Sequence, residues 1–175
     1  MKNQDILENQ VNYAYLAVGS NLGNKKINIE KAKFLVQSEN TKIIKFSGFY
    51  STKSWPIISF PDYINVVLLI KTSLSLKSLF NKLKLIEKNM GRKPKPKNFP
   101  RICDIDIIDF NGSVFNQNNK TLNLEVPHPR MHNRNFVLIP LFEIDREWIH
   151  PKIKKNIVKL IFNLRDKDIM GIKFN

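Results

Sequence analysis

The order of strand-like and helix-like segments constrains the fold of this chain more than any other feature of its sequence. Residues 13–23 begin as an apolar strand that breaks at Gly19, and residues 24–40 then carry apolar side chains at helical spacing. Two further segments, 42–51 and 63–72, are rich in β-branched and aromatic side chains, which is typical of strands. The first part of the chain therefore reads strand, helix, strand, strand.

A second helix and a fourth strand follow. Apolar side chains recur every three or four positions between Leu76 and Met90, with Ser75 as a candidate N-cap and Gly91 at the position after a helix that favours glycine. After a basic, proline-rich segment, residues 101–110 return to a strand pattern. The complete order, β-α-β-β-α-β, is the ferredoxin-like pattern, in which helices pack on one face of an antiparallel sheet.

The C-terminal third supplies elements to cover the opposite face. Asn111-Gly112 is a hairpin signal, and residues 136–144 predict a helix with a start or a kink at Pro140. A last amphipathic helix is expected to carry Ile153, Ile157, Leu160, Ile161 and Leu164. We therefore expect an α+β fold in three layers, α/β/α, with a ferredoxin-like antiparallel sheet in the middle.

Composition is that of an ordinary globular protein, with 42% apolar and 25% charged residues in a chain of 175. We expect one domain over 13–175, preceded by a frayed extension over 1–12. There is no apolar run of the ~20 residues that a membrane helix needs and no secretory signal, so we expect a cytoplasmic protein without a membrane partner. Cys103 is the only cysteine, which excludes an internal disulfide and fits a buried residue in a reducing compartment.

The fourth strand, within "RICDIDIIDFNG", carries two acids. Side chains alternate along a strand, so Asp104 and Asp106 share one face while Cys103, Ile105 and Ile107 share the other. A solvated sheet face is the simplest interpretation. Carboxylates are rarely buried unless they are paired or bind a metal, so the surrounding sequence decides between the alternatives.

Basic residues precede the two aspartates and follow them. The preceding segment carries Arg92, Lys93, Lys95, Lys97 and Arg101. Acids that hold Mg²⁺, next to cations that neutralise phosphate, are typical of metal-assisted phosphoryl transfer. A solvated loop remains the alternative for the individual lysines. The net charge of +14 favours an anionic partner but decides nothing alone, because Lys is frequent throughout the chain.

Downstream, "VPHPRMHNRNF" matches no zinc-ligand spacing and is interpreted as a second phosphate-facing segment, with a surface turn as the alternative.

Six motifs occur in order between Tyr13 and Leu164, and they read "VGSNLGN", "FYST", "FPDYIN", "IEKNMGR", "PRICDIDII" and "VPHPRMHNRNFVLIPL". Together they resemble the 6-hydroxymethyl-7,8-dihydropterin pyrophosphokinases of folate biosynthesis. The resemblance implies transfer of pyrophosphate from ATP to the pterin hydroxymethyl group, with release of AMP. It also implies a monomer with two small-molecule substrates and no nucleic-acid partner.

The resemblance assigns roles to individual residues. Asp104 and Asp106 would hold two Mg²⁺ ions, and Arg92 and Arg101 would stabilise the transferring group. The implied ATP-binding residues are Glu87, Lys84, Lys97, Ile107, His128 and Arg134. For the pterin, the implied residues are Tyr63 and Phe136, which would sandwich the ring, Asn65, which would bind its edge, and Thr52, Ser54 and Trp55. Core packing is the alternative role for the two aromatics.

The chain departs from the family pattern in the two loops that are expected to close over the substrates, 51–61 and 91–100. Pro94 stands where a second arginine is common, Asn98-Phe99 replaces Trp-Gly, and Phe60 replaces a frequent glutamine. A relative that binds ATP or pterin without chemistry is therefore one alternative. The other is a ferredoxin-like RNA-binding protein, although no strand carries the aromatic RNP1 signature.

Overall fold

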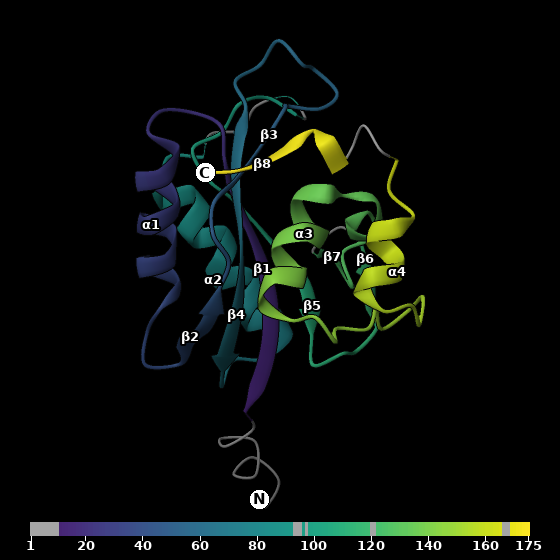
Figure 1. The fold of residues 1–175 in the computed structure, drawn as a ribbon. Helices are drawn as coiled ribbons and strands as arrows, with labels where there is room; N and C mark the ends of the chain where they lie inside the picture. The colour runs from purple at the N-terminus through teal and green to yellow at the C-terminus, as the bar shows by residue number, and fades with distance from the viewer. Residues whose placement is uncertain (1–10, 93–95, 97, 120–121, 166–168) are drawn as a thin grey trace, which may run out of the picture.

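The computed structural model describes residues 11–92, 96, 98–119, 122–165 and 169–175. Its strands are β1 (Asn12–Ser20), β2 (Thr41–Phe46), β3 (Tyr50–Thr52), β4 (Tyr63–Thr72), β5 (Asp104–Phe110), β6 (Phe115–Asn118), β7 (Asn123–Val126) and β8 (Ile172–Phe174). Its helices are α1 (Lys25–Val36), α2 (Leu76–Asn89), α3 (Asn135–Ile144) and α4 (Ile157–Phe162), with a short 3₁₀ turn, η1 (Met131–Asn133) (Figure 1).

Six strands form one antiparallel sheet in the order β5-β1-β4-β3-β8, and β2 also pairs with β4. The segment expected as one strand over 42–51 is divided into β2 and β3, which follow one another along the same edge of β4. The order β5-β1-β4-β2/β3 confirms the ferredoxin-like prediction. β1 already begins at Asn12, which pairs with Thr72 and is buried, so the expected frayed segment is wrong at this residue.

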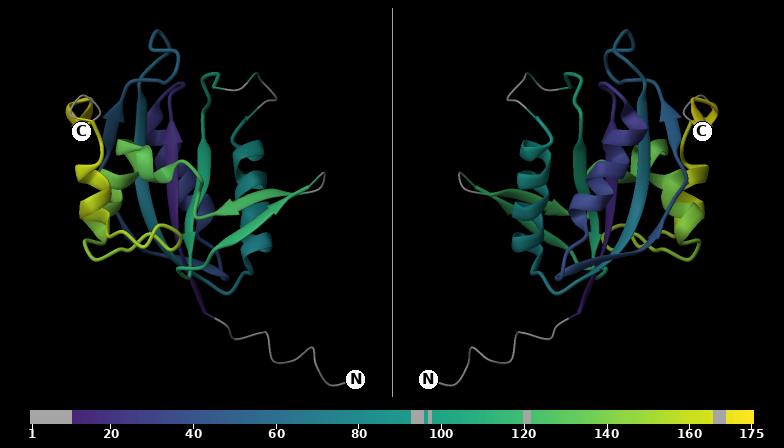
Figure 2. Two further views of the ribbon diagram at one scale, coloured as in Figure 1. Left: turned by 90° about the vertical axis from the view of Figure 1, so that its right-hand side faces the viewer. Right: turned by 90° about the vertical axis from the view of Figure 1, so that its left-hand side faces the viewer.

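Helices cover both faces of the sheet, which confirms the three layers (Figures 1 and 2). A first hydrophobic core lies between the sheet and α1 and α2, and includes Leu16, Ile29, Leu68, Leu79 and Leu83. A second core lies between the sheet and α3 and α4, and includes Val67, Ile108, Leu138, Leu141 and Ile157. In the described part of the chain, no helix is long and apolar enough to cross a membrane.

The turn at Asn111-Gly112 forms, but the expected hairpin around it does not. Both residues have positive φ (54° and 62°), and the Ser113 N–H donates to the Phe110 carbonyl at 3.0 Å. β6 nevertheless pairs with β7 in a separate two-stranded sheet. β5 pairs instead with β1, and Asn111 extends that pairing because its N–H donates to the Tyr13 carbonyl at 2.9 Å.

The C-terminal helices differ from the expected boundaries. α3 begins at Asn135, so Pro140 lies inside the helix and not at its start. α4 is shorter than predicted, because the Asn156 side chain caps it by accepting the Lys159 N–H at 2.9 Å. Ile153 therefore precedes the helix.

Candidate active site

Asp104 and Asp106 lie on the sheet face that carries the second core. Ile105 and Ile107 alternate with them and are buried in the first core, and Cys103 is also buried. The prediction that the two acids share one face is confirmed. Their side chains are 27% and 32% exposed, so neither carboxylate is covered by the helices of that layer.

The residues of β1 that lie beside the two acids are small. In the strand register, Gly19 of β1 lies between Asn65 of β4 and Asp104 of β5, and Ala17 lies beside Asp106. Residues opposite one another in neighbouring strands point to the same face. A Cβ atom on Gly19 would lie 2.9 Å from the Asn65 Oδ1 atom. The Asn65 side chain and the Tyr63 ring, whose nearest carbon would lie 3.5 Å from that Cβ, therefore lie directly against the glycine.

Two arginines bind Asp104. The Arg92 Nη1 atom lies 2.8 Å from its Oδ1, and the Arg101 Nη1 atom lies 3.2 Å from its Oδ2. Burial disfavours the charged carboxylate, but Arg101, Arg92 and Lys84 together outweigh burial and hold the pKa of Asp104 below its usual value. Asp104 is therefore ionised at neutral pH.

Glu87 of α2 binds Arg92 and Lys84, two of the cations near Asp104. Its side chain is 2% exposed, its Oε1 accepts the Ile105 N–H at 2.7 Å, and the same oxygen lies 2.9 Å from the Lys84 Nζ. Its Oε2 forms an ion pair with Arg92. A nucleotide outside the core would be influenced by Glu87 chiefly through Lys84 and Arg92, which this carboxylate holds in place.

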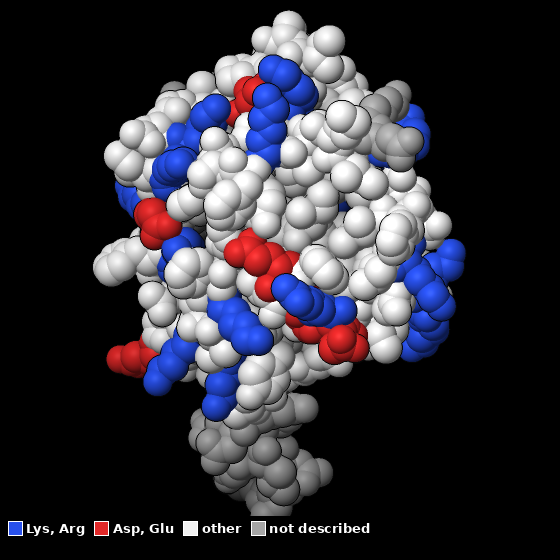
Figure 3. Space-filling view, viewed as in Figure 1, with Lys and Arg blue, Asp and Glu red and all other residues white. Residues whose placement is uncertain are grey.

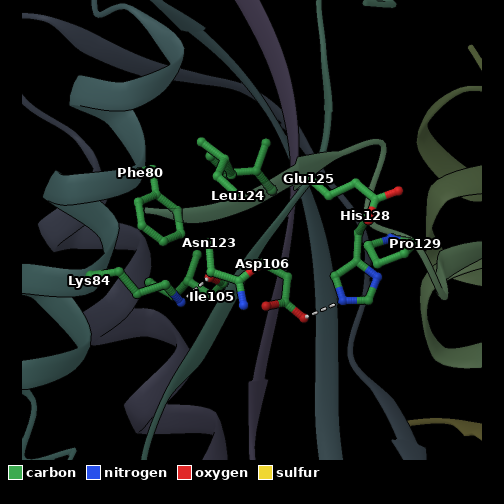
Figure 4. A pocket seen from close by; sticks show the side chains of 10 residues that line it. Phe80, Lys84, Ile105, Asp106, Asn123, Leu124, Glu125, His128 and Pro129 are labelled. Atoms are coloured by element: carbon green, nitrogen blue, oxygen red, sulfur yellow. Dashed lines mark hydrogen bonds and ion pairs between the residues drawn. The ribbon is translucent and has the colours of Figure 1, made fainter. Parts of the chain in front are cut away.

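Asp106 faces a histidine and an arginine. Its Oδ2 lies 3.7 Å from the His128 Nε2, the pair joined by the dashed line in Figure 4, and 3.4 Å from the Arg134 Nη1. The His128 Nδ1 accepts the Arg130 N–H at 3.1 Å, so the neutral ring carries its proton on Nε2. Burial lowers the pKa of His128, and the two nearby arginines lower it further against the opposing effect of Asp106. His128 is therefore neutral at pH 7.

A cavity of about 260 Å³ opens beside Asp106 (Figure 4). It lies between α2, β5, β7 and the turn before η1, and Phe80 and Leu124 form part of its wall. Three of the residues expected at the nucleotide also line it, namely Lys84, Ile107 and His128. The structure thus brings these three together around one space.

The residues expected at the pterin fall into two groups. Tyr63 and Asn65 lie two positions apart on β4 and share the face that carries Asp104. Asn65 is buried, and its Nδ2 donates to the Thr52 Oγ1 at 3.2 Å. Phe136 is the second residue of α3, with the Arg134 guanidinium 5.4 Å from its ring centre.

Ser54 and Trp55 lie in the β3–β4 loop, and their side chains do not point toward Asp104 and Asp106. The Ser54 hydroxyl is buried and donates to the Pro61 carbonyl at 2.6 Å, within its own loop. Trp55 is 77% exposed. The structure therefore places Tyr63 and Asn65 on the sheet face that carries the acids, with Thr52 hydrogen-bonded to Asn65, whereas Trp55 projects into solvent.

Residues 15–146 match the family model described as 7,8-dihydro-6-hydroxymethylpterin-pyrophosphokinase (HPPK). The chain belongs to this family. It is 39% identical over 141 residues to the 2-amino-4-hydroxy-6-hydroxymethyldihydropteridine pyrophosphokinase of Aquifex aeolicus, which covers 81% of this chain and 85% of that protein. The corresponding protein of Haemophilus influenzae is 36% identical over 160 residues, covering 91% and 97%.

Other relatives of this HPPK-family chain are much longer. The folic acid synthesis protein fol1 of Pneumocystis carinii is 32% identical over 172 residues, which is 98% of this chain but 22% of that protein. A crystal structure of Plasmodium falciparum HPPK-DHPS superimposes with a TM-score of 0.77 at 18% identity, over 98% of this chain and 49% of that one. The chain therefore spans half or less of these two proteins, and the second comparison shows a shared fold.

The donor set of the HPPK site fits a hard divalent cation. Asp104 and Asp106 present carboxylate oxygens side by side, and each carboxylate has about four lone-pair positions, of which the arginines occupy only part. Among the described residues, no three His, Cys, Asp or Glu side chains form a group that could hold a metal ion. Mg²⁺ does not need a third side chain, because substrate phosphates and water complete its coordination.

Asn21, between the first strand and the first helix, was not predicted to be a site residue. Its side chain is buried, its Oδ1 accepts the Arg101 N–H at 2.8 Å, and its Nδ2 donates to the Ser54 Oγ at 3.2 Å and to the Pro61 carbonyl at 3.3 Å. An asparagine after a strand is the only signal, and ordinary turns give the same one. Lys97 lies outside the described residues, as do 93–95 of the expected loop.

Proposed function

We propose that this chain transfers the terminal diphosphate of ATP to the hydroxymethyl oxygen of 6-hydroxymethyl-7,8-dihydropterin, giving AMP and the pterin diphosphate. The observation that supports this most directly is the pair Asp104 and Asp106 on an open sheet face, with Arg92, Arg101 and Arg134 in contact. Carboxylates for metal ions beside arginines for phosphate are what phosphoryl transfer requires. Membership of the HPPK family suggests the donor and the acceptor.

The nucleotide would occupy the cavity beside Asp106. Phe80 and Leu124 offer an apolar wall for the faces of a purine base. Lys84 and the Nε2–H of neutral His128 offer donors to ribose or phosphate oxygens, and Arg134 offers a guanidinium. Two Mg²⁺ ions, held by Asp104 and Asp106, would neutralise and orient the triphosphate when bound.

The pterin would lie over the small residues of β1. In the strand register Gly19 lies between Asn65 and Asp104, so a ring that binds over it would have one edge at the amide and its hydroxymethyl side toward the acids. Asn65 offers both a donor and an acceptor to the heterocycle. Tyr63 and Phe136 would stack on the two ring faces.

Arg92 and Arg101 would carry the electrostatic part of the reaction. A guanidinium remains protonated at any physiological pH, so each arginine can stabilise the negative charge of the transferring group without exchanging a proton. Both are held within 3.2 Å of the Asp104 carboxylate. Phosphoryl transfer depends mainly on positioning and charge stabilisation, so the proposal assigns no general base.

The test is to incubate the protein with Mg²⁺, ATP and the reduced pterin and to identify the nucleotide product. We expect AMP, and formation of ADP would refute the reaction class. Asp104→Asn and Asp106→Asn should each lower kcat at least ~100-fold, the scale of a lost electrostatic group, with little change in melting temperature. Glu30→Gln, on the far side of the first core, is the matched control and should retain full activity.

RNA binding receives less support from the fold. RNA-binding ferredoxin-like domains stack bases on an open sheet face, whereas both faces of this sheet carry helices (Figure 1). Lys and Arg are spread over the face drawn in Figure 3 and do not form a single patch there. A relative that binds substrates without chemistry remains the second candidate, because Pro94 occupies a position where the family pattern has an arginine. Binding of ATP without AMP formation would favour it.

We further propose that residues 13–175 act as one pyrophosphokinase domain, as a cytoplasmic monomer. A buried thiol at Cys103 fits a reducing compartment. On the edge strand β2, Lys42 and Lys45 disfavour pairing with a second sheet. Sedimentation analysis would test the monomer, and a dimer at assay concentrations would contradict it.

A further inference from the structure

An aromatic pair joins the segment that precedes β4 to the segment that precedes β5, outside both hydrophobic cores. The ring centres of Phe60 and Phe99 lie 5.5 Å apart with their planes inclined by 56°, within the range that aromatic pairs prefer. Phe60 precedes β4 and Phe99 precedes β5. Neither ring belongs to the residues that form the two cores, and Phe99 is 39% exposed. Core burial therefore does not account for this contact.

Phe99 is linked directly to an arginine of the active site. Its carbonyl accepts the Arg101 Nε–H at 3.3 Å, while the Nη1 of the same guanidinium lies 3.2 Å from the Asp104 Oδ2. Pro100 follows, and a residue before proline is restricted to extended conformations. The Phe99 N–H also donates to the Pro96 carbonyl at 3.3 Å. A shift of the Phe99 ring would thus turn its carbonyl away from Arg101.

Phe60 is held from the opposite side by hydrogen bonds of its neighbour. The Pro61 carbonyl accepts the Ser54 hydroxyl at 2.6 Å and the Asn21 Nδ2 at 3.3 Å. Asn21 also binds both backbone polar groups of Arg101, at 2.8 and 3.1 Å. The two segments are therefore joined by a polar link through Asn21 and by an apolar link through the rings.

We propose that Phe60 and Phe99 are positioning residues for Arg101: their contact fixes the Phe99 carbonyl, which orients the guanidinium toward Asp104 and the transferring group. The Asn21 link fixes the Arg101 backbone, whereas the aromatic link fixes the direction of its side chain. The inference rests on the proposed function, in which Arg101 stabilises the charge of the reaction.

The test measures AMP formation by Phe60→Ala, Phe99→Ala and the double variant. An aromatic contact of this kind corresponds to a loss of about 2- to 10-fold in rate. We expect that loss in kcat, with the KM of the pterin unchanged, and we expect the double variant to lose no more than either single variant, because one contact is shared. Phe99→Trp keeps an aromatic ring at this position and should retain most of the wild-type rate. Phe162→Ala, at an 82% exposed aromatic of α4, is the matched control and should match the wild type.

The decisive measurement adds Phe60→Ala to Arg101→Ala. If the ring acts through Arg101, the added change costs nothing further; a further loss as large as in the wild-type background would overturn the positioning role. Additive losses in the Phe60 and Phe99 double variant, or a change in KM alone, would overturn it as well. Melting curves confirm that each variant is folded before rates are compared. A wild-type protein that forms no AMP would refute the proposed function and this role together, whereas an active wild type with additive losses refutes this role alone.

Discussion

Glu87 and Glu30 both lie on helices and both form an ion pair with a lysine, but Glu87 is buried and Glu30 is exposed. Each lies 2.9 Å from a lysine three positions away, Lys84 for Glu87 and Lys33 for Glu30. The Glu30 side chain is 54% exposed, whereas that of Glu87 is 2% exposed and also accepts the buried Ile105 N–H at 2.7 Å. We therefore expect replacement of Glu87 to cost far more stability than the same replacement of Glu30.

The structure sets the size of the difference. Glu87→Ala leaves the Ile105 N–H without its acceptor, at ~1–3 kcal/mol, and breaking a buried ion pair from one side typically costs ~3–5 kcal/mol. Arg92 and Lys84 are 33% and 38% exposed, so water can solvate them in part and the lower end applies. We expect a loss of about 3 kcal/mol in the free energy of unfolding for Glu87→Ala. Glu30→Ala should cost less than ~0.5 kcal/mol, as for exposed pairs.

Urea unfolding, followed by circular dichroism and extrapolated linearly to water, measures both values. Glu87→Gln adds a useful intermediate, because its side-chain oxygen can still accept the Ile105 N–H while the charge is lost. Its cost should fall between those of the other two variants. Equal stabilities of Glu87→Ala and Glu30→Ala would refute the reasoning, since they would mean that the buried carboxylate contributes no more than an exposed one.

Three further predictions concern the strand surface and the charges around it. Gly19→Ala should raise the KM of the pterin about 10-fold or more, measured by steady-state kinetics, because the new methyl group would lie 2.9 Å from the Asn65 oxygen; an unchanged KM would contradict it. His150 has its pKa lowered to about 4, mainly by burial, and its Nδ1 accepts two backbone N–H groups, so the stability that its neutral ring confers is complete above pH 6.5 and is lost as the pH falls toward 4. His150→Asn keeps an acceptor and should flatten this pH dependence in thermal melts. Finally, Asp104→Asn should bind Mg²⁺-free ATP at least as tightly as the wild type in calorimetry, because its two arginine partners lose a competing carboxylate.

The sequence predicted what depends on local periodicity. The helix at 76–89, its cap at Ser75 and the shared face of Asp104 and Asp106 follow from spacings of a few residues, and all three are confirmed. The role of Gly19 could not be predicted in this way, because it depends on which residues of β4 and β5 lie opposite it.

The other features that the sequence did not predict depend on contacts between residues far apart in the chain. The turn at Asn111-Gly112 was predictable from two residues, but whether its flanking strands pair depends on competition from β1. The buried hydrogen bonds of Asn21 and the contact of Phe60 with Phe99 join segments far apart in the sequence. Neither leaves a periodic signal, so only the folded arrangement identifies these residues.

The acids and the arginines of the site are supported by different parts of the fold. Asp104 and Asp106 belong to a strand whose position is fixed by pairing with β1. Arg92 follows α2 and is also paired with Glu87, and Arg101 precedes β5 and also donates to the Phe99 carbonyl. In the structure both arginines neutralise Asp104. Because the arginines occupy only part of its lone-pair positions, Asp104 could hold a metal ion while the two arginines also face the phosphates of the substrate. The same two arginines would therefore stabilise the site when it is empty and the transferring group when it is full.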